Sequence, residues 1–272
     1  MHSDTKMPMG ACSHIGIFCV AVYGDAVHED GARRAESEWH GELANAKHGE
    51  KGKIIIMYDL VLFDLDGTLV NTIKGLVAAV NHSLSKYGLK TRTEQEVQSF
   101  VGNGIRKLIE RSVPEGTSTD ITDKVFGEFK SYYVEHCLDN LEEYPGIKEL
   151  VKELYEKSVP MAVVTNKNDA AAKKIIKQFF GDKISVVIGA HENIPKKPAP
   201  DMVNMAFDEI NRRGITFKNP VFVGDSEVDI QTALNSGMSY ISVSYGFKTR
   251  EFLEQAGAKT IAEDAEELKR IL

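Results

Sequence analysis

Two aspartates spaced one residue apart, Asp64 and Asp66, directly follow the apolar residues 61–63 and directly precede a turn at Gly67 and Thr68. Bringing carboxylates together away from water is unfavourable unless a positive group lies between them. The pair therefore indicates a bound cation or a proton-transfer task. A calcium loop is excluded, because the sixth position counted from Asp64 is a leucine and not the glycine that such a loop requires.

Short apolar runs that suit buried strands recur along the chain from residue 58 onward. They lie at residues 58–64, 160–166, 184–190, 220–225 and 240–246. Their nearly continuous Val, Ile, Leu and Phe content is typical of strands covered on both faces, as in a parallel sheet between helices. Helical patterns at residues 146–158 and 169–180 alternate with these runs. The order predicts an α/β fold, a doubly wound parallel sheet of the Rossmann-like kind.

One connection, residues 72–143, is too long to be a loop inside a compact domain. It contains only helical patterns. The first has apolar residues on one face, at Ile73, Leu76, Val77, Val80 and Leu84. A second amphipathic helix is expected at residues 123–141. We therefore predict an inserted α-helical cap subdomain over residues 72–143, with the α/β core at residues 57–71 and 144–272.

Residues 28–53 are polar and show no sustained helical or strand period, and the apolar residues 14–24 before them resemble the centre of a signal peptide only weakly. We expect a flexible N-terminal extension, with the functional domain beginning at Met57. Whether translation starts there or at the first methionine stays open. Cys12, His14 and Cys19 lie in the extension, but their spacing fits no standard zinc finger.

The composition limits the partners of this 272-residue chain. Its formal net charge of -7 and pI near 5.7 provide no basic face for nucleic acid. No apolar run approaches the roughly 18 residues that a membrane-spanning helix needs. The three cysteines are widely scattered, which predicts no disulfide framework and favours a reducing, cytoplasmic location. We expect a small-molecule partner and a monomer or homodimer.

In an open parallel sheet, ligands bind beyond the carboxyl ends of the strands. Polar side chains that could do chemistry follow three of the predicted strands or lie in a basic, proline-rich segment. They are Asp64 and Asp66 after the first strand, Thr165 and Asn166 at the end of the second, Lys196 and Lys197 in the basic segment, and Asp225 and Asp229 after the fourth. Carboxylate oxygens without thiolate or histidine partners favour a hard cation, and magnesium (Mg²⁺) suits a site that also binds phosphate. The sequence therefore predicts that a metal ion and a phosphoryl group share this edge.

Four segments resemble the four motifs of the haloacid dehalogenase superfamily, in the same order and strand context. They are DLDGTLV, VVTN, KKPAP and VGDSEVD, beginning at residues 64, 163, 196 and 223. The helical segment between the first two motifs resembles the cap of the phosphoglycolate phosphatase-like branch. The resemblance covers essentially all of residues 57–272 and none of residues 1–56.

The resemblance implies a covalent phosphoryl transfer. Asp64 is similar to the nucleophile that attacks phosphorus and forms an aspartyl-phosphate. Asp66 resembles the general acid that protonates the leaving oxygen and then acts as a base towards the hydrolytic water. Mg²⁺ would be bound by Asp64, the backbone carbonyl of Asp66 and Asp225, while Asp229 would hold a metal-bound water or orient Lys197.

The same resemblance assigns the phosphate-binding groups. Thr165 and Lys197 would hold the phosphate oxygens, with the backbone amides of Asn166 and Gly67 as further donors. Lys197 is preferred to Lys196 because it directly precedes the first proline of the Lys-Pro-x-Pro pattern.

The glycine turn formed by Gly102, Asn103 and Gly104 in the predicted cap has two interpretations, and both stay open. It is either a plain connection between helices or a loop that reaches over the substrate. Arg106, just after it, is a candidate for contacting a substrate carboxylate, and the alternative is an ordinary surface charge.

Together these features predict a Mg²⁺-dependent phosphate-monoester hydrolase that acts on a small phosphorylated metabolite, with phosphoglycolate as the first substrate to try. A phosphomutase of the β-phosphoglucomutase kind would use the same two aspartates, and a non-catalytic phosphate-binding module would keep the same pocket. Dehalogenation is disfavoured, because Asp66, Asp225 and a metal would be superfluous for displacing a halide from carbon.

Overall fold

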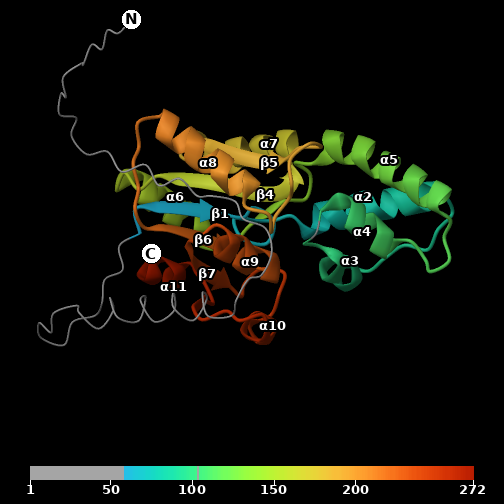
Figure 1. Ribbon diagram of the computed structural model, residues 1–272. Helices are drawn as coiled ribbons and strands as arrows, with labels where there is room; N and C mark the ends of the chain where they lie inside the picture. The colour runs from blue at the N-terminus through green and yellow to red at the C-terminus, as the bar shows by residue number, and fades with distance from the viewer. Residues whose placement is uncertain (1–57, 103) are drawn as a thin grey trace, which may run out of the picture. The chain divides into compact units, whose positions relative to one another are not determined.

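The computed structural model describes residues 58–102 and 104–272 (Figure 1). The predictions for residues 1–56 and for Asn103 lie outside these residues. Six parallel strands form one sheet in the order β5–β4–β1–β6–β7–β8. Their bounds are β1 Leu60–Phe63, β4 Met161–Asn168, β5 Val186–Ala190, β6 Pro220–Gly224, β7 Ser239–Val243 and β8 Ile261–Ala262.

Helices cover both faces of the sheet and bury its central strand β1. One face is covered by α6 (Ile147–Glu156), α7 (Asp169–Phe180) and α11 (Ala265–Ile271), and the other by α8 (Asp201–Arg212) and α9 (Glu227–Asn235), while the short α10 (Arg250–Gln255) connects β7 to β8. Val61 and Phe63 pack on the first face, and Leu60 and Leu62 pack on the second. Every position of β1 is therefore buried, which explains its continuous apolar sequence. The predicted doubly wound α/β fold is confirmed.

The strand register brings the carboxyl ends of three strands to one edge of the sheet. Phe63 of β1 lies opposite Val163 of β4 on one side and opposite Val223 of β6 on the other. The polar segments that follow these three residues therefore leave the sheet at nearly the same level. This is the edge at which a doubly wound sheet binds its ligands.

Four helices are inserted between β1 and α6, and they form a hydrophobic core of their own. They are α2 (Ile73–Lys86), α3 (Glu94–Phe100), α4 (Ile105–Ser112) and α5 (Thr119–His136), together called the helical insert below. Leu84, Val97, Ile109 and Phe129, one from each helix, are fully buried in this second core. Figure 1 shows the helical insert beyond the carboxyl ends of β1 and β4. Its boundaries at residues 72 and 143 stay a prediction.

Two short antiparallel strands join the helical insert to the sheet. β2 (Val70–Asn71) precedes α2, and β3 (Glu142–Glu143) follows α5. Val70 pairs with Glu143, and Asn71 pairs with Glu142. The chain therefore leaves the core and re-enters it at neighbouring points.

The structure differs from the predicted elements in the bounds of α5 and in three very short strands. α5 begins at Thr119 and not at residue 123, because the Ser118 hydroxyl accepts a hydrogen bond from a backbone amide of the first turn. It ends at His136, before the predicted residue 141, and Asn140 takes a left-handed backbone conformation shortly afterwards. The sequence does not predict β2, β3 or β8, since two residues are too few to show a strand pattern. In residues 58–102 and 104–272, no helix combines the length and apolar content needed to cross a membrane.

Candidate active site

The turn after β1 depends on a glycine. Gly67 has a φ of +85°, a left-handed conformation that residues with a Cβ rarely adopt. A Cβ at this position would also overlap the carboxylate of Asp225. The sequence DLDG therefore turns sharply and brings the chain after Asp66 against the end of β6.

Two more glycines make room for carboxylates at the end of β6. A Cβ on Gly224 would overlap the side chain of Asp229. A Cβ on Gly246 would overlap both Asp225 and the carbonyl oxygen of Gly67. The backbone is thus packed closely around the two carboxylates, and a larger residue at either glycine would displace them.

Asp229 belongs both to the site and to the N-terminal cap of α9. Its Oδ2 accepts hydrogen bonds from the backbone N–H of Ser226 at 3.1 Å and from the Ser226 hydroxyl at 2.6 Å. Its Oδ1 accepts a hydrogen bond from Lys197 Nζ at 2.7 Å. Both oxygens of Asp229 therefore have protein donors. For Asp225, it is Oδ2 that accepts a 2.7 Å hydrogen bond, from the backbone N–H of Phe247.

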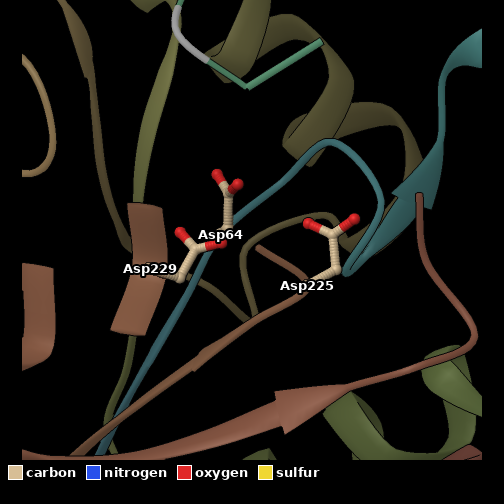
Figure 2. Close-up of side chains that lie close together, drawn as sticks. All are labelled: Asp64, Asp225 and Asp229. Carbon is tan, nitrogen blue, oxygen red and sulfur yellow. The ribbon is translucent and has the colours of Figure 1, made fainter. Parts of the chain in front are cut away.

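Asp64, Asp225 and Asp229 form a cluster of three carboxylates that are largely shielded from solvent (Figure 2). One oxygen of each lies within 4.8 Å of the others. Burial raises the pKa of Asp64 to about 6, although the charge of Lys197 lowers it, and burial also raises the pKa of Asp225. Carboxylates that have lost water in this way are stabilised by a cation between them.

Lys197 is a buried cation in direct contact with this cluster. Its Nζ lies 3.0 Å from Asp64 Oδ1 and 2.7 Å from Asp229 Oδ1, and the residue is 4% exposed. Burial lowers the pKa of Lys197, but the charges of Asp229 and Asp64 raise it above its ordinary value, so the amine stays protonated. The neighbouring Lys196 is exposed, so the two adjacent lysines lie in opposite environments.

Asp66 contacts a second buried lysine, which is not among the predicted site residues. Asp66 Oδ1 accepts hydrogen bonds from Thr72 Oγ1 at 2.6 Å and from Lys167 Nζ at 2.7 Å. Lys167 is 5% exposed and lies on β4. Side chains two residues apart on a strand share a face, and Lys167 lies two residues after Thr165. This spacing could have identified Lys167 as a site residue from the sequence.

Asn166 connects three parts of the site. Its Nδ2 donates hydrogen bonds to the carbonyl oxygens of Gly102 at 3.3 Å and Lys197 at 3.1 Å. Thr165 is buried beside it, and the Thr165 hydroxyl accepts a 3.2 Å hydrogen bond from the backbone N–H of Lys167. Asn166 thus ties Gly102, which lies between α3 and α4, to the segment that carries Lys197.

A pocket lies between the carboxyl edge of the sheet and the helical insert. The predicted site residues that line it are Asp64, Asp66, Gly102, Gly104, Thr165, Asn166 and Asp225. Lining residues that were not predicted include Tyr133, Lys167, Phe247 and Lys248. The structure therefore brings the motifs of the sheet edge together with Gly102 and Gly104 around one pocket.

Arg106 lies outside the lining of this pocket. Its guanidinium pairs with Glu110 at 2.8 Å and with Asp123 at 2.6 Å, both within the helical insert. It also lies 5.3 Å from the centre of the Phe126 ring. The predicted contact of Arg106 with a substrate carboxylate would require these ion pairs to break.

The charges of the site fit a divalent cation. The four carboxylates Asp64, Asp66, Asp225 and Asp229 face the two lysines Lys167 and Lys197. Among these six groups, with every one ionised, two negative charges are in excess, and a bound cation would offset them. Asp64 Oδ1 is buried and accepts no well-formed hydrogen bond from the described residues, although Lys197 Nζ lies 3.0 Å away. Oxygen donors of this kind are the ligands that Mg²⁺ prefers.

The chain matches the family model of haloacid dehalogenase-like hydrolases over residues 61–243. A phosphoglycolate phosphatase from Neisseria meningitidis serogroup A is 32% identical over 203 residues, covering 73% of this chain and 85% of that protein. A crystal structure from Lactobacillus delbrueckii subsp. bulgaricus, provisionally classed as a phosphoglycolate phosphatase, has a TM-score of 0.73 and 31% identity, covering 80% of this chain and 99% of that one. A predicted phosphoglycolate phosphatase from Haemophilus somnus has a TM-score of 0.69 and 29% identity, covering 78% and 97%.

The chain belongs to the haloacid dehalogenase-like hydrolase family. The matched residues contain all four motifs and the helical insert. The predicted resemblance to the phosphoglycolate phosphatase-like branch is confirmed, and so is the predicted enzyme class, a phosphatase. The roles of the individual site residues stay predictions.

Proposed function

We propose that this phosphatase hydrolyses small phosphate monoesters through an aspartyl-phosphate formed on Asp64, with Mg²⁺ as its cofactor. The observation that carries the proposal is the set of groups around Asp64. Asp225, Asp229 and Lys197 lie close to Asp64 and suit a cation and a phosphate. Asp66 lines the same pocket as Asp64.

The metal ligands in this proposal are Asp64, Asp225 and the backbone carbonyl of Asp66. Asp229 is assigned to orienting Lys197, because protein donors already occupy both of its oxygens. When bound, Mg²⁺ would neutralise negative charge so that an anionic nucleophile can approach an anionic phosphate.

In the first half of the reaction, a carboxylate oxygen of Asp64 forms a bond to phosphorus, and the ester P–O bond breaks. The departing oxygen takes a proton from Asp66, so the alcohol leaves uncharged. Asp66 would use Oδ2 for this task, since Thr72 and Lys167 both donate to Oδ1. These two donors fix the orientation of the carboxyl group before the substrate arrives.

In the second half, a water molecule attacks the aspartyl-phosphate while Asp66 accepts its proton. The P–O bond to Asp64 breaks, which releases phosphate and restores the carboxylate. In both halves the Lys197 amine, the Thr165 hydroxyl and the backbone N–H of Asn166 would stabilise the charge on the phosphoryl oxygens.

Phosphoglycolate is the substrate that we propose to test first. Relatives named for this activity are similar to the chain over both the α/β core and the helical insert. A fold alone does not fix a substrate. The panel therefore also includes small sugar phosphates, nucleoside monophosphates and pyrophosphate.

Release of inorganic phosphate from this panel, with and without Mg²⁺, tests the proposal. We expect Mg²⁺-dependent release by the wild type and none by Asp64→Asn. Asp182→Asn is a matched control at an exposed aspartate that pairs with Lys177, and it should keep the wild-type rate. Undiminished release by Asp64→Asn would contradict the nucleophile assignment, and an isomerised sugar phosphate without phosphate release would indicate the phosphomutase.

A further inference from the structure

The helical insert contributes a buried phenol to the pocket. Tyr133 lies on α5, is 3% exposed and lines the pocket. Its hydroxyl is buried and makes no well-formed hydrogen bond with the described residues, although the Lys167 ammonium lies beside the oxygen. A buried hydroxyl whose proton has no acceptor is unfavourable, so a ligand that offers an acceptor there would be stabilised.

Lys167 presents its charge to the same part of the pocket. Its Nζ lies 4.8 Å from the centre of the Tyr133 ring and 2.7 Å from Asp66 Oδ1. The ammonium group of Lys167 is paired with the carboxylate of Asp66. An ammonium group has three N–H donors, of which Asp66 takes one and the Tyr133 oxygen lies beside a second. Lys167 therefore has at least one donor left for a ligand.

The role proposed for Asp66 defines which part of a substrate lies near these two residues. Asp66 must contact the ester oxygen that leaves, and Lys167 Nζ is one hydrogen bond away from the same carboxyl group. A carboxylate whose carbon is two bonds from the ester oxygen is therefore within reach of Lys167 and Tyr133. Its oxygens could accept hydrogen bonds from both.

We infer that Lys167 and Tyr133 recognise a carboxylate on the leaving group, two bonds from the ester oxygen, and make the enzyme selective for phosphates of 2-hydroxy acids. The inference rests on the proposed function, because it takes Asp66 as the acid. It gives the α/β core and the helical insert one recognition residue each, since Lys167 lies on β4 and Tyr133 lies on α5.

Lys248 is the alternative cation for this task. It also lines the pocket, and its Nζ lies 5.3 Å from the centre of the Phe252 ring. Lys248 is half-buried, whereas Lys167 is 5% exposed. A charge shielded from water attracts an anion more strongly than an exposed one, which favours Lys167.

The test compares kcat/KM for 2-phosphoglycolate and for ethyl phosphate, in which a methyl group replaces the carboxylate. For the wild type we expect a preference for phosphoglycolate of about 10³-fold or more. Lys167→Met should lower both rates, because Asp66 loses a partner, and should reduce the preference about 100-fold. Tyr133→Phe keeps the ring and removes only the hydroxyl, so it should fold normally and reduce the preference about 3–10-fold. Lys248→Met should leave the preference within about twofold of the wild type.

An unchanged preference in Lys167→Met, or its loss in Lys248→Met, would overturn the inference. If the wild type hydrolysed both esters equally well, the proposed function would stand and the inference would fail. If the wild type hydrolysed neither ester, calorimetric measurement of ester binding in the presence of Mg²⁺ would still test the inference. Asp64→Asn, which cannot form the aspartyl-phosphate, should bind phosphoglycolate at least about tenfold more tightly than ethyl phosphate. Adding Lys167→Met should abolish the difference, and equal binding by Asp64→Asn alone would overturn the inference.

Discussion

Replacing Lys197 by methionine tests whether the carboxylate cluster depends on this buried cation. Lys197 Nζ lies 3.0 Å from Asp64 and 2.7 Å from Asp229, and solvent is largely excluded from all three side chains. Methionine fills similar space without a charge, so the variant leaves two adjacent carboxylates without their cation. Lys196 is the neighbouring residue and is exposed, which makes Lys196→Met the matched control.

We expect a large loss of stability for Lys197→Met in the metal-free protein. Removing one partner of a buried ion pair lowers the free energy of unfolding by about 3–5 kcal/mol. For a chain of this size each kcal/mol corresponds to roughly 2–4 °C in Tm, so the midpoint should fall by about 6–20 °C. Lys196→Met should stay within about 0.5 kcal/mol of the wild type, as exposed substitutions do.

The loss of stability should grow as the pH rises. Burial raises the pKa of Asp64 in the folded protein to about 6, above its ordinary value of 3.8. Between these values the folded state binds more protons than the unfolded state, so stability falls as the pH increases. Lys197 lowers this pKa, and its removal therefore moves the upper limit of the range above 6. The deficit of Lys197→Met should be largest near about pH 8 and smaller near about pH 5, where Asp64 carries a proton.

Urea unfolding in the presence of a chelator, followed by far-ultraviolet circular dichroism, measures this difference. Repeating it with saturating Mg²⁺ extends the test, because the bound cation would replace the missing charge. Mg²⁺ should therefore stabilise Lys197→Met more than it stabilises the wild type. Equal urea midpoints for Lys197→Met and Lys196→Met near about pH 8 would refute the reasoning.

Three further changes test other parts of the site. Asp66→Asn should lower kcat for phosphate release about 10²–10⁴-fold and leave the Mg²⁺ affinity measured by calorimetry nearly unchanged, because the proposed metal ligand is the backbone carbonyl of residue 66. An unchanged kcat would contradict the acid–base role of Asp66. Gly246→Ala should lose Mg²⁺ binding because a Cβ there overlaps Asp225, whereas Gly127→Ala, where a Cβ meets open space, should bind Mg²⁺ normally. Equal Mg²⁺ affinities of the two variants would contradict the close packing around Asp225. The fragment of residues 57–272 should keep full phosphatase activity, because every predicted site residue lies in it, and a folded but inactive fragment would assign a role to the segment removed.

Much of the fold follows from patterns that are local in the sequence. β1 is predicted because all of its positions are apolar, and both of its faces are covered in the structure. The helical pattern at residues 169–180 coincides with α7, which Asn168 caps by accepting a hydrogen bond from a backbone amide. β2 and β3 are different, because each is defined by pairing with a strand that lies far away along the chain. No short-range pattern can show such a pair.

Some residues of the site could likewise be predicted from the sequence, and others could not. The carboxylates at strand ends can be found from local patterns. The pairing of Lys167 with Asp66 cannot, because 101 positions separate the two residues and only the fold brings them together. Tyr133 lies among the apolar residues of an amphipathic helix, and its contact with Lys167 and its place in the pocket lining, which only the fold shows, distinguish it from the core. The ion pair of Arg106 could have been predicted from the sequence, since Glu110 lies four residues later, at the spacing of a helical ion pair.

The pairing of β2 with β3 affects how this enzyme can be engineered. Val70 and Asn71 pair with Glu143 and Glu142, so both ends of the helical insert meet at one two-residue ladder. The groups proposed for phosphoryl transfer all come from the α/β core, whereas Tyr133 comes from the insert. Exchanging the insert between relatives at this ladder would therefore change the recognition of the leaving group and retain the chemistry at phosphorus. The ladder is a natural junction for chimeric phosphatases with new substrate preferences.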